Sequence, residues 1–151
     1  MYLPSSWDRR HILNLIGSYK FNKGWNFSAR WRFSGGAPYS PIDEDLSTNR
    51  EAWNITNQYY VDYKRFNSLR LSSNHSLDIR IDKEIYFKKW VLNFYADVQN
   101  AYNFQSESVP IYTNKDVNGN VLEDPGGDPT KQGLRIFDNR SGTVLPAVGV
   151  I

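Results

Sequence analysis

Alternation of apolar and polar residues over Trp25–Gly36 constrains this chain more than any other feature of its sequence. Within WNFSARWRFSGG, apolar residues hold every odd position as far as Phe33, and Asn, Ser and Arg hold the even positions. Successive side chains of a β-strand point to opposite faces, so the segment predicts a strand with one apolar and one polar face. A soluble protein would turn the apolar face inward, whereas a membrane barrel would turn it outward into lipid.

The same two-residue period recurs along the chain. Further runs of this kind cover His11–Phe21, Asn74–Ile85, Trp90–Tyr102 and Leu145–Ile151. Asn22-Lys23-Gly24 is a hairpin signal between the first two strands, and a brief turn at Phe87-Lys88-Lys89 joins the next two. The sequence therefore predicts five antiparallel strands.

Two long segments break the pattern. Ala37–Ser73 and Asn103–Thr143 are rich in Pro, Gly, Asn and Ser and are expected to be long loops, the first with a short extended segment around Trp53–Tyr63. Short and long connections thus alternate strictly. Short periplasmic turns, long outer loops and strands of about ten residues are typical of an up-and-down outer-membrane β-barrel.

Composition excludes several other classes of protein. The 151 residues include no cysteine, so the sequence offers no disulfide framework and no thiol nucleophile. A net charge of +2 is too small to indicate a nucleic-acid partner. No run approaches the ~20 apolar residues of a membrane-spanning helix, so any membrane crossing must use strands. The amino terminus lacks the apolar region of a signal peptide, so an outer-membrane location predicts a piece of a longer protein.

The two faces of the predicted strands differ in kind. The polar face is expected to line the lumen of a barrel with Asn14, Arg30, Arg32, Asp78, Arg80, Asp82, Asp97 and Gln99. The rings of the apolar face gather near strand ends, as in the aromatic girdles of a barrel, and are expected to face lipid: Phe21, Trp25, Phe27, Trp31, Phe33, Trp90, Phe94 and Tyr102. The alternative is a soluble β-sandwich, an adhesin or carbohydrate-binding module, with its apolar faces packed together.

Several motifs in this order resemble the carboxy-terminal end of TonB-dependent outer-membrane receptors, especially those of Bacteroidetes-type bacteria. They are Asp8-Arg9-Arg10-His11, Gly35-Gly36-Ala37-Pro38-Tyr39, Leu77-Asp78-Ile79-Arg80 and the segment Asp97–Asn103. The resemblance covers nearly the whole chain. It implies that residues 1–151 are about five strands of a plugged barrel of about 22 strands, with the plug and the earlier strands absent.

The resemblance also implies a function. Receptors of this family import scarce nutrients such as siderophores, cobalamin, peptides or glycans across the bacterial outer membrane. The expected partners are outer-membrane lipid, the remainder of the barrel with its plug, and the inner-membrane TonB complex, reached through the parent protein. No cofactor and no enzymatic activity are expected. A non-transporting barrel, either an anchor or an enzyme, is a further alternative.

Individual residues admit chemical interpretations that the pattern does not favour. His11 and His75 could form a metal pair but are better explained as interfacial rings. Asp78 and Asp82 could act as paired acid and base, although the intervening Arg80 favours a lattice of charges. The segment Asp116–Asn120 hints at calcium, but its Asn-Gly step favours a hairpin turn.

Loop aromatics are the remaining candidates for ligand contact. They are Trp53, Tyr59, Tyr60 and Tyr63, which could stack on a sugar or an aromatic chelator. The favoured interpretation is that they belong to a strand that extends above the membrane. The sequence contains no set of nucleophile, base and orienting residue, so it predicts no enzyme.

Overall fold

The computed structural model describes residues 3–137 and 139–151. Its regular structure is mostly β, with 47% strand and 12% helix. The sheets are antiparallel, which confirms the all-β class predicted from the sequence. No helix in the described part of the chain is long and apolar enough to cross a membrane.

The chain forms two compact units. The sheet unit comprises Arg9–Gly36, Ser72–Glu107 and Arg140–Ile151, and the loop unit comprises Met1–Asp8, Ala37–Leu71 and Ser108–Asn139.

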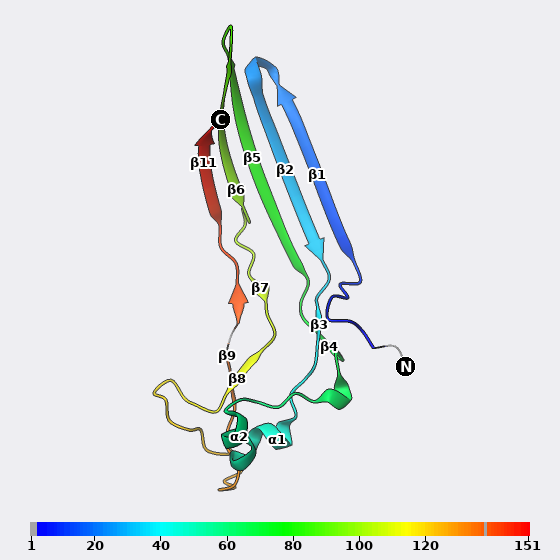
Figure 1. Ribbon diagram of the computed structural model, residues 1–151, viewed down its shortest axis with the longest axis vertical. Helices are drawn as coiled ribbons and strands as arrows, with labels where there is room; N and C mark the ends of the chain where they lie inside the picture. Colours follow the sequence, from blue (N-terminus) through cyan, green and yellow to red (C-terminus); the bar gives the residue numbers. More distant parts are fainter. Residues whose placement is uncertain (1–2, 138) are drawn as a thin grey trace. The chain divides into compact units, whose positions relative to one another are not determined.

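The sheet unit contains one up-and-down sheet of five strands (Figure 1). Its members are β1 (Ile12–Phe21), β2 (Trp25–Ser34), β5 (Asn74–Tyr86), β6 (Val91–Gln99) and β11 (Leu145–Val150). They are hydrogen-bonded in this order, and each pair of neighbours is antiparallel. A second, short pairing joins β7 (Ser106–Glu107) to β10 (Arg140–Ser141). All five predicted strands are therefore present.

Connections of two lengths alternate along the sheet. The three-residue turn Asn22–Gly24 joins β1 to β2, and residues 87–90 join β5 to β6 at the same end. Residues 35–73 and 100–144 form the long connections. Lys23 and Gly24 both have positive φ, 66° and 77°, which suits a tight turn between twisted antiparallel strands. The hairpin predicted at Asn22-Lys23-Gly24 is confirmed.

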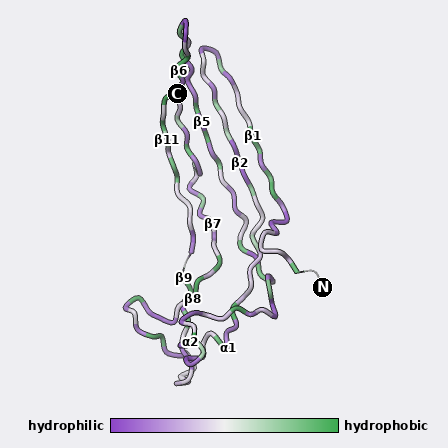
Figure 2. Tube along the Cα trace, viewed as in Figure 1, coloured by the Kyte–Doolittle hydropathy of each residue, from purple (hydrophilic) through white to green (hydrophobic). Residues whose placement is uncertain are grey.

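The strand register sorts the side chains onto two faces, and Figure 2 shows the hydropathy alternating along the strands. Trp31 lies opposite Leu15 on β1 and Leu77 on β5, whereas Arg30 lies opposite Asp78. The ring face carries Phe21, Trp25, Phe27, Trp31, Phe33 and Phe94. The charged face carries Asn14, Arg30, Arg32, Asp78, Arg80, Asp82, Asp97 and Gln99.

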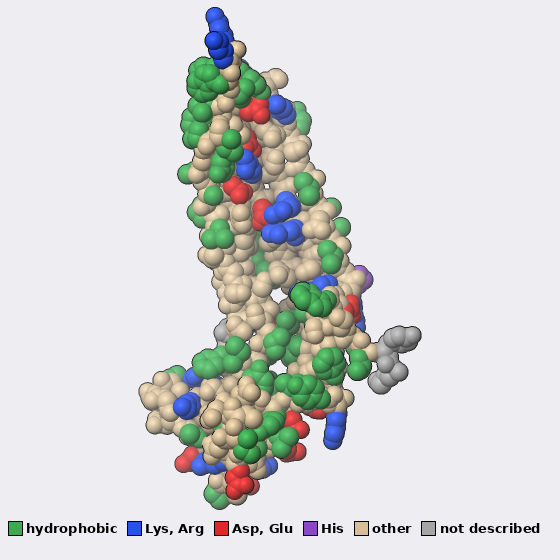
Figure 3. All heavy atoms as spheres, viewed as in Figure 1, with side chains coloured by type: hydrophobic (Ala, Val, Ile, Leu, Met, Phe, Trp, Pro, Cys, Tyr) green, Lys and Arg blue, Asp and Glu red, His purple; other side chains and the backbone are tan. Residues whose placement is uncertain are grey.

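Several rings of the ring face are exposed, whereas two carboxylates of the charged face are buried. On the ring face Phe21 is 52% and Trp25 is 45% exposed, and Figure 3 shows hydrophobic side chains gathered at the surface near the short-turn end. On the charged face Asp78 and Asp82 are each 7% exposed. The one large hydrophobic side chain that is buried among the described residues, Trp53, belongs to the loop unit. The ring face therefore has no hydrophobic core beneath it.

The two outer edges of the sheet differ in their backbone donors. Within the described residues, no strand pairs with the outer edge of β1 or of β11. Asn93 and Ile151 exchange backbone hydrogen bonds of 2.9 and 2.8 Å, and the alternation of an antiparallel ladder then directs the nitrogen of Pro146 toward the outer edge. Proline has no N–H, so this edge lacks a donor, whereas the ten residues of β1 include no proline.

The loop unit is built from short elements. They are β3 (Pro38–Tyr39), α1 (Glu44–Thr48), α2 (Arg50–Thr56), η2 (Tyr63–Arg65), β4 (Leu69–Arg70), β8 (Ile111–Thr113) and β9 (Arg135–Phe137). Strand β3 pairs with β4, and β8 pairs with β9. Helix α1 begins where Asp43 accepts from the Leu46 N–H at 3.1 Å. Helix α2 begins where Asn49 accepts from the Ala52 N–H at 3.0 Å.

The predicted irregular loop over Ala37–Ser73, with an extended segment at Trp53–Tyr63, is wrong. Residue Trp53 lies in α2, which ends where Asn57 adopts a positive φ of 55°. Helices of five and seven residues contain too few apolar positions to establish a 3.6-residue period. The capping residues are the one sequence signal that could have located them.

Strand β6 is shorter than the predicted run Trp90–Tyr102. The strand ends at Gln99, and Asn100 adopts a positive φ of 52°. The Asn100 Oδ1 accepts from the Phe104 N–H at 2.8 Å, which closes a turn. Tyr102 therefore lies in a turn instead of a strand. The predicted loop Asn103–Thr143 also contains regular structure, since β7, β8, β9 and β10 lie within it.

The interior of the loop unit is largely polar. Gln132, which is 2% exposed, accepts from the Asn114 Nδ2 at 2.9 Å through its Oε1. Its Nε2 donates to the backbone oxygen of Ser47 at 3.4 Å, and its N–H donates to the oxygen of Thr48 at 2.8 Å. Gln132 thereby fixes α1 to a segment more than eighty residues later in the chain.

Replacing Gln132 with leucine is expected to lower the free energy of unfolding of the loop unit by about 2–3 kcal/mol, because the buried amide of Asn114 would lose its acceptor. The midpoint of urea unfolding measures the change. Gln58→Leu is the matched control, since Gln58 lies on the surface of the same unit, and its expected effect is below about 0.5 kcal/mol. Equal midpoints for the two variants would refute the prediction.

Candidate functional site

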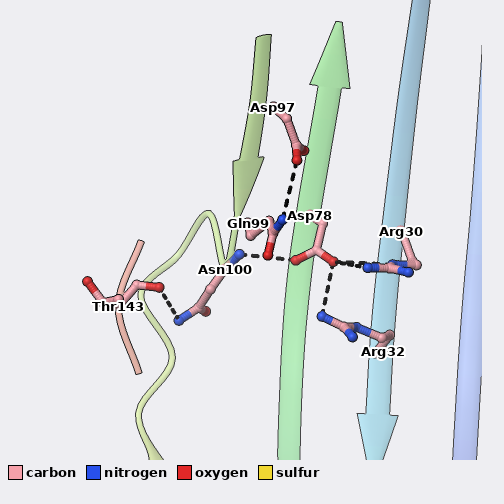
Figure 4. Close-up of polar contacts among 7 residues, drawn as sticks. All are labelled: Arg30, Arg32, Asp78, Asp97, Gln99, Asn100 and Thr143. Carbon is pink, nitrogen blue, oxygen red and sulfur yellow. Dashed lines mark hydrogen bonds and ion pairs between the residues drawn. The ribbon is translucent and has the colours of Figure 1, made fainter. Parts of the chain in front are cut away.

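A carboxylate shared by two arginines lies at the centre of the charged face (Figure 4). The Oδ2 of Asp78 accepts from Nε and Nη2 of Arg30 at 3.2 and 2.8 Å. The same oxygen accepts from Nη2 of Arg32 at 3.1 Å. The other oxygen, Oδ1, accepts from the Asn100 N–H at 3.1 Å. Because hydrogen bonds between ionised groups are stronger than neutral ones, this cluster ties β2, β5 and the turn after β6 together.

Strand register explains the pairing. Arg30 and Asp78 are direct partners across β2 and β5, and Arg32 is the next residue of the same face along β2. Directly opposite side chains are close enough for oppositely charged groups to pair. The sequence predicts that these residues share a face, but the identity of the pair depends on a register that only the fold provides.

A second cluster lies on the same face, nearer the short turns. Arg80 donates from Nε and Nη2 to the carboxylate of Asp82 at 2.7–3.0 Å. The guanidinium carbon of Arg80 also lies 4.4 Å from the centroid of the Tyr95 ring. Asn93 donates from Nδ2 to Asp82 at 3.2 Å, while its own Oδ1 is buried and has no hydrogen-bond partner among the described residues.

The other predicted members of the polar lattice make fewer contacts. Gln99 donates from Nε2 to Asp97 at 3.5 Å (Figure 4). Asn14 of β1 lies opposite Arg32 of β2. The register places all eight predicted residues on the charged face. The structure gathers Arg30 and Arg32 around Asp78 and pairs Arg80 with Asp82, whereas Asp97, Gln99 and Asn14 lie outside these two clusters.

A cavity of about 420 Å³ with a mixed lining of polar and apolar side chains lies beside the Asp78 cluster, at the end of the sheet that carries the long connections. Its lining includes the uncharged hydroxyl and amide side chains of Asn14, Ser34, Asn74, Ser76, Ser106 and Ser141. The guanidinium that also lines it, from Arg32, is already paired with Asp78. Groups of this kind hydrogen-bond to neutral polar ligands. Sequence reasoning missed this cavity; the polar run Ser72–Ser76 is the signal that could have indicated it.

His75 contacts aromatic rings at this end of the sheet. Its Nδ1 lies 2.6 Å from the Tyr102 hydroxyl oxygen, and its ring centroid lies 3.9 Å from that of Phe104. His11 precedes β1. In the described part of the chain, no cluster of three or more His, Cys, Asp or Glu side chains could hold a metal ion. The aromatic contacts agree with the interpretation of His75 as a ring residue at the rim of the sheet.

Six of the eight rings predicted to face lipid lie on the ring face, and the other two lie in turns. Trp90 precedes β6 and stacks on Phe87, with ring centroids 3.9 Å apart. Tyr102 lies in the turn after β6. Trp31 and Phe33 stack on each other at 6.0 Å. Pairs of rings therefore lie near both ends of the strands.

Three of the four loop aromatics predicted as ligand candidates, Tyr59, Tyr60 and Tyr63, line one cavity of about 420 Å³, and Trp53 is not part of its lining. Trp53 is buried in α2, and the Tyr60 hydroxyl donates to a backbone oxygen of α2 at 2.9 Å. Tyr59 packs edge-on against Tyr112 at 5.4 Å, and Tyr63 is exposed. The favoured interpretation, a strand that extends above the membrane, is wrong because Trp53 is helical.

Tyr59 and Tyr112 also line a further cavity of about 420 Å³ inside the loop unit, together with Tyr39 and Phe66. Burial raises the pKa of Tyr112, and the proximity of Tyr39 and Glu44 raises it further. The phenol therefore stays neutral and able to donate a hydrogen bond at physiological pH. This cavity, whose lining is mainly apolar, is a second place where a ligand could contact the protein.

The Asp116 carboxylate closes a turn between Lys115 and Val121, which form an antiparallel bridge. Its Oδ1 accepts from the N–H groups of Asn118 and Asn120, each at 2.8 Å. Its Oδ2 accepts from the Asn120 Nδ2 at 3.2 Å. The hairpin turn favoured by the sequence is confirmed, and the turn itself uses both oxygens of the carboxylate.

This turn should weaken in acid. Backbone hydrogen bonding from Asn120 holds the pKa of Asp116 below its ordinary value of 3.8. The ionised Asp116 carboxylate therefore stabilises the turn fully well above pH 3.8, and this stabilisation is lost as the pH falls through the lower pKa that Asp116 has in the folded turn. NMR should show the Asp116 carboxyl titrating below pH 3.8, with protection of the Asn118 amide falling over the same interval. Asp116→Asn should remove this pH dependence, and a midpoint at or above 3.8 would contradict the prediction.

Comparison with known proteins yields no relative. No protein-family model, no curated protein and no solved structure matches the chain. The interpretation of the candidate site therefore depends on its geometry and on the sequence pattern.

Proposed function

We propose that this chain forms part of the β-barrel of a TonB-dependent receptor in a bacterial outer membrane, where the parent protein imports a scarce nutrient. The observation that carries the proposal is the exposed ring face, which no other part of the described chain covers. Asp78 and Asp82 are withdrawn from water, while Phe21 and Trp25 remain exposed. Water on both sides of the sheet would disfavour this arrangement, whereas lipid on the ring face and a hydrated lumen on the charged face would favour it.

Strand length and connection length support the same proposal. Strands β1, β2, β5 and β6 contain 10, 10, 13 and 9 residues. A tilted strand needs ~9–11 residues to cross a bilayer. On this proposal the short turns face the periplasm and the long connections face the outside. A β-sandwich adhesin or carbohydrate-binding module would need a second layer over the ring face, and the described residues provide none.

The proposed partners follow from the two outer edges and from the charged face of the sheet. Further strands of the parent barrel would hydrogen-bond to the outer edges of β1 and β11. The plug would lie on the charged face, and the inner-membrane TonB complex would act through the parent protein. A siderophore, cobalamin, peptide or glycan on its way through the barrel would pass the cavity beside Asp78.

Adjacent residues of β2 provide a test of membrane orientation. The chain has no cysteine, so Ala29→Cys and Ser28→Cys each introduce a single thiol, one on each face. After attachment of an environment-sensitive fluorophore and reconstitution into phosphatidylcholine vesicles, nitroxide lipids should quench the probe at position 29 and aqueous iodide the probe at position 28. Iodide quenching at both positions, or a cooperatively melting monomer in plain buffer, would overturn the proposal in favour of the sandwich.

Import is tested in the bacterium that encodes the chain. One strain lacks the gene for this chain, and a second strain lacks the inner-membrane TonB protein. Neither strain should grow on the same limiting nutrient. A plasmid copy of the gene should restore growth only in the strain that lacks the gene. Growth that depends on TonB but not on this gene would exclude a role in import. That result would leave an anchor or an enzyme as the function of the barrel.

A further inference from the structure

Lys83 is the one charged side chain on the ring face of the five described strands. It lies on β5, opposite Trp25 on β2 and Phe94 on β6. Its neighbours of the same face along β5 are Ile81 and Ile85. A cation thus interrupts a row of apolar side chains, in a position where the strand pattern predicts another apolar residue.

The ammonium of Lys83 is directed toward the short-turn end of the sheet. Its Nζ donates to the backbone oxygen of Lys23 and lies 5.1 Å from the centroid of the Trp25 ring. An aliphatic stem on apolar surface with the charge at its margin is the arrangement of a lysine that snorkels toward water. An ammonium has three donors, so the bond to Lys23 leaves Lys83 able to pair with an anion.

The turns at this end add positive charge. Asn22–Gly24 contributes Lys23, and residues 87–90 contribute Lys88 and Lys89, while neither turn contains an acidic residue. Figure 3 shows basic side chains beyond the hydrophobic ones at this end. The two acidic neighbours of Lys83 in the sequence, Asp82 and Glu84, lie on the opposite face, where Asp82 accepts from Arg80 and Glu84 accepts from Lys20. The margin of the ring face is therefore basic.

An apolar crevice of about 380 Å³ adjoins this charge. Its lining comprises Phe21, Trp25, Asn26, Phe27 and Ile81. Trp25 belongs both to the crevice and to the contact with Lys83, so the crevice and the ammonium are adjacent. One end of the site suits a hydrocarbon chain and the other suits an anion, which is the chemistry of a phospholipid.

We propose that this site binds an anionic phospholipid. Its phosphate pairs with the ammonium of Lys83, and one acyl chain lies in the crevice between Phe21 and Phe27. The inference rests on the proposed function, because lipid reaches the ring face only in a membrane. The unbalanced lysines of the two turns favour a lipid with net negative charge over a zwitterionic one.

Brominated lipids test the proposal, because bromine on an acyl chain quenches tryptophan on contact. The full chain in neutral detergent micelles is titrated with brominated phosphatidylglycerol or brominated phosphatidylcholine. Half-maximal quenching should need about fivefold less phosphatidylglycerol, the difference expected for one lysine beside an anionic headgroup. Lys83→Gln should abolish this preference, Lys83→Arg should keep it, and Trp25→Phe should remove most of the quenching that distinguishes the lipids. Circular dichroism checks that each variant remains folded.

Lys64→Gln is the control for net charge, because Lys64 is exposed in the loop unit, and it should leave the preference unchanged. Equal quenching by both lipids, or a preference that survives in Lys83→Gln, would overturn the lipid site and leave the membrane proposal intact. Quenching by neither lipid would contradict both proposals.

Discussion

Replacing Trp53 with alanine is expected to unfold the loop unit while the five-stranded sheet persists. Loss of a buried tryptophan lowers the free energy of unfolding by about 3–5 kcal/mol. The loop unit depends strongly on this side chain, because Trp53 is the one large hydrophobic side chain buried in the described part of the unit, whereas Ser47, Asn114 and Gln132, which are also buried, are polar. Limited proteolysis with mass spectrometry should find new cleavage sites within Ala37–Leu71 and none within β2 or β5.

Trp7 provides the matched control. It belongs to the loop unit but is 86% exposed, so Trp7→Ala should change the free energy of unfolding by less than about 0.5 kcal/mol. Identical digestion patterns for the two alanine variants would show that Trp53 is not the core of the unit. New cleavage sites in the sheet would show that the two units do not unfold separately.

Replacing Asp78 with asparagine should weaken the sheet itself. The substitution keeps the shape of the side chain but removes the charge that faces Arg30 and Arg32. Breaking a fully buried pair costs about 3–5 kcal/mol, and because both arginines are about half exposed we expect about 2–3 kcal/mol. The midpoint of urea unfolding in detergent micelles, followed by tryptophan fluorescence, measures the loss.

Asp97→Asn makes the same change of charge on the same face. The carboxylate of Asp97 accepts from Gln99 at 3.5 Å and lies opposite Arg80, whose closer partner is Asp82. The expected loss is therefore below about 1 kcal/mol. Equal losses for the two variants would attribute the effect to net charge instead of to the hydrogen-bonded cluster around Asp78.

The sequence was sufficient to predict the sheet because a two-residue period is a local property. The alternation within each strand shows which of its residues share a face, and the turn Asn22-Lys23-Gly24 contains residues that adopt positive φ. The faces of all five strands and their sequential order follow from these signals. The pairing of Arg30 with Asp78 does not, because a shift of the register would bring other residues together without changing either face.

The loop unit could not be predicted in the same way. Its helices are short, and long-range contacts such as Gln132 with Ser47 stabilise its interior. Local patterns contain no information about contacts of this kind. Proline and asparagine led to the prediction of an irregular loop, although the capping residues Asp43 and Asn49 indicated two helices that are too short to show a 3.6-residue period. Lys83 was overlooked because it falls in the apolar row that the strand pattern otherwise predicts.

The unequal edges of the sheet have a consequence for handling this chain in isolation. Pro146 removes a donor from the outer edge of β11, while β1 offers ten residues of uninterrupted backbone. Self-association should therefore begin with two copies joined antiparallel through β1. The Gly35 N–H donates to the His11 oxygen at 2.8 Å, so the alternation of the ladder directs the Ile16 N–H outward and the Gly17 N–H toward β2. Ile16→Pro should therefore convert such dimers to monomers, whereas Gly17→Pro should break the bond to β2.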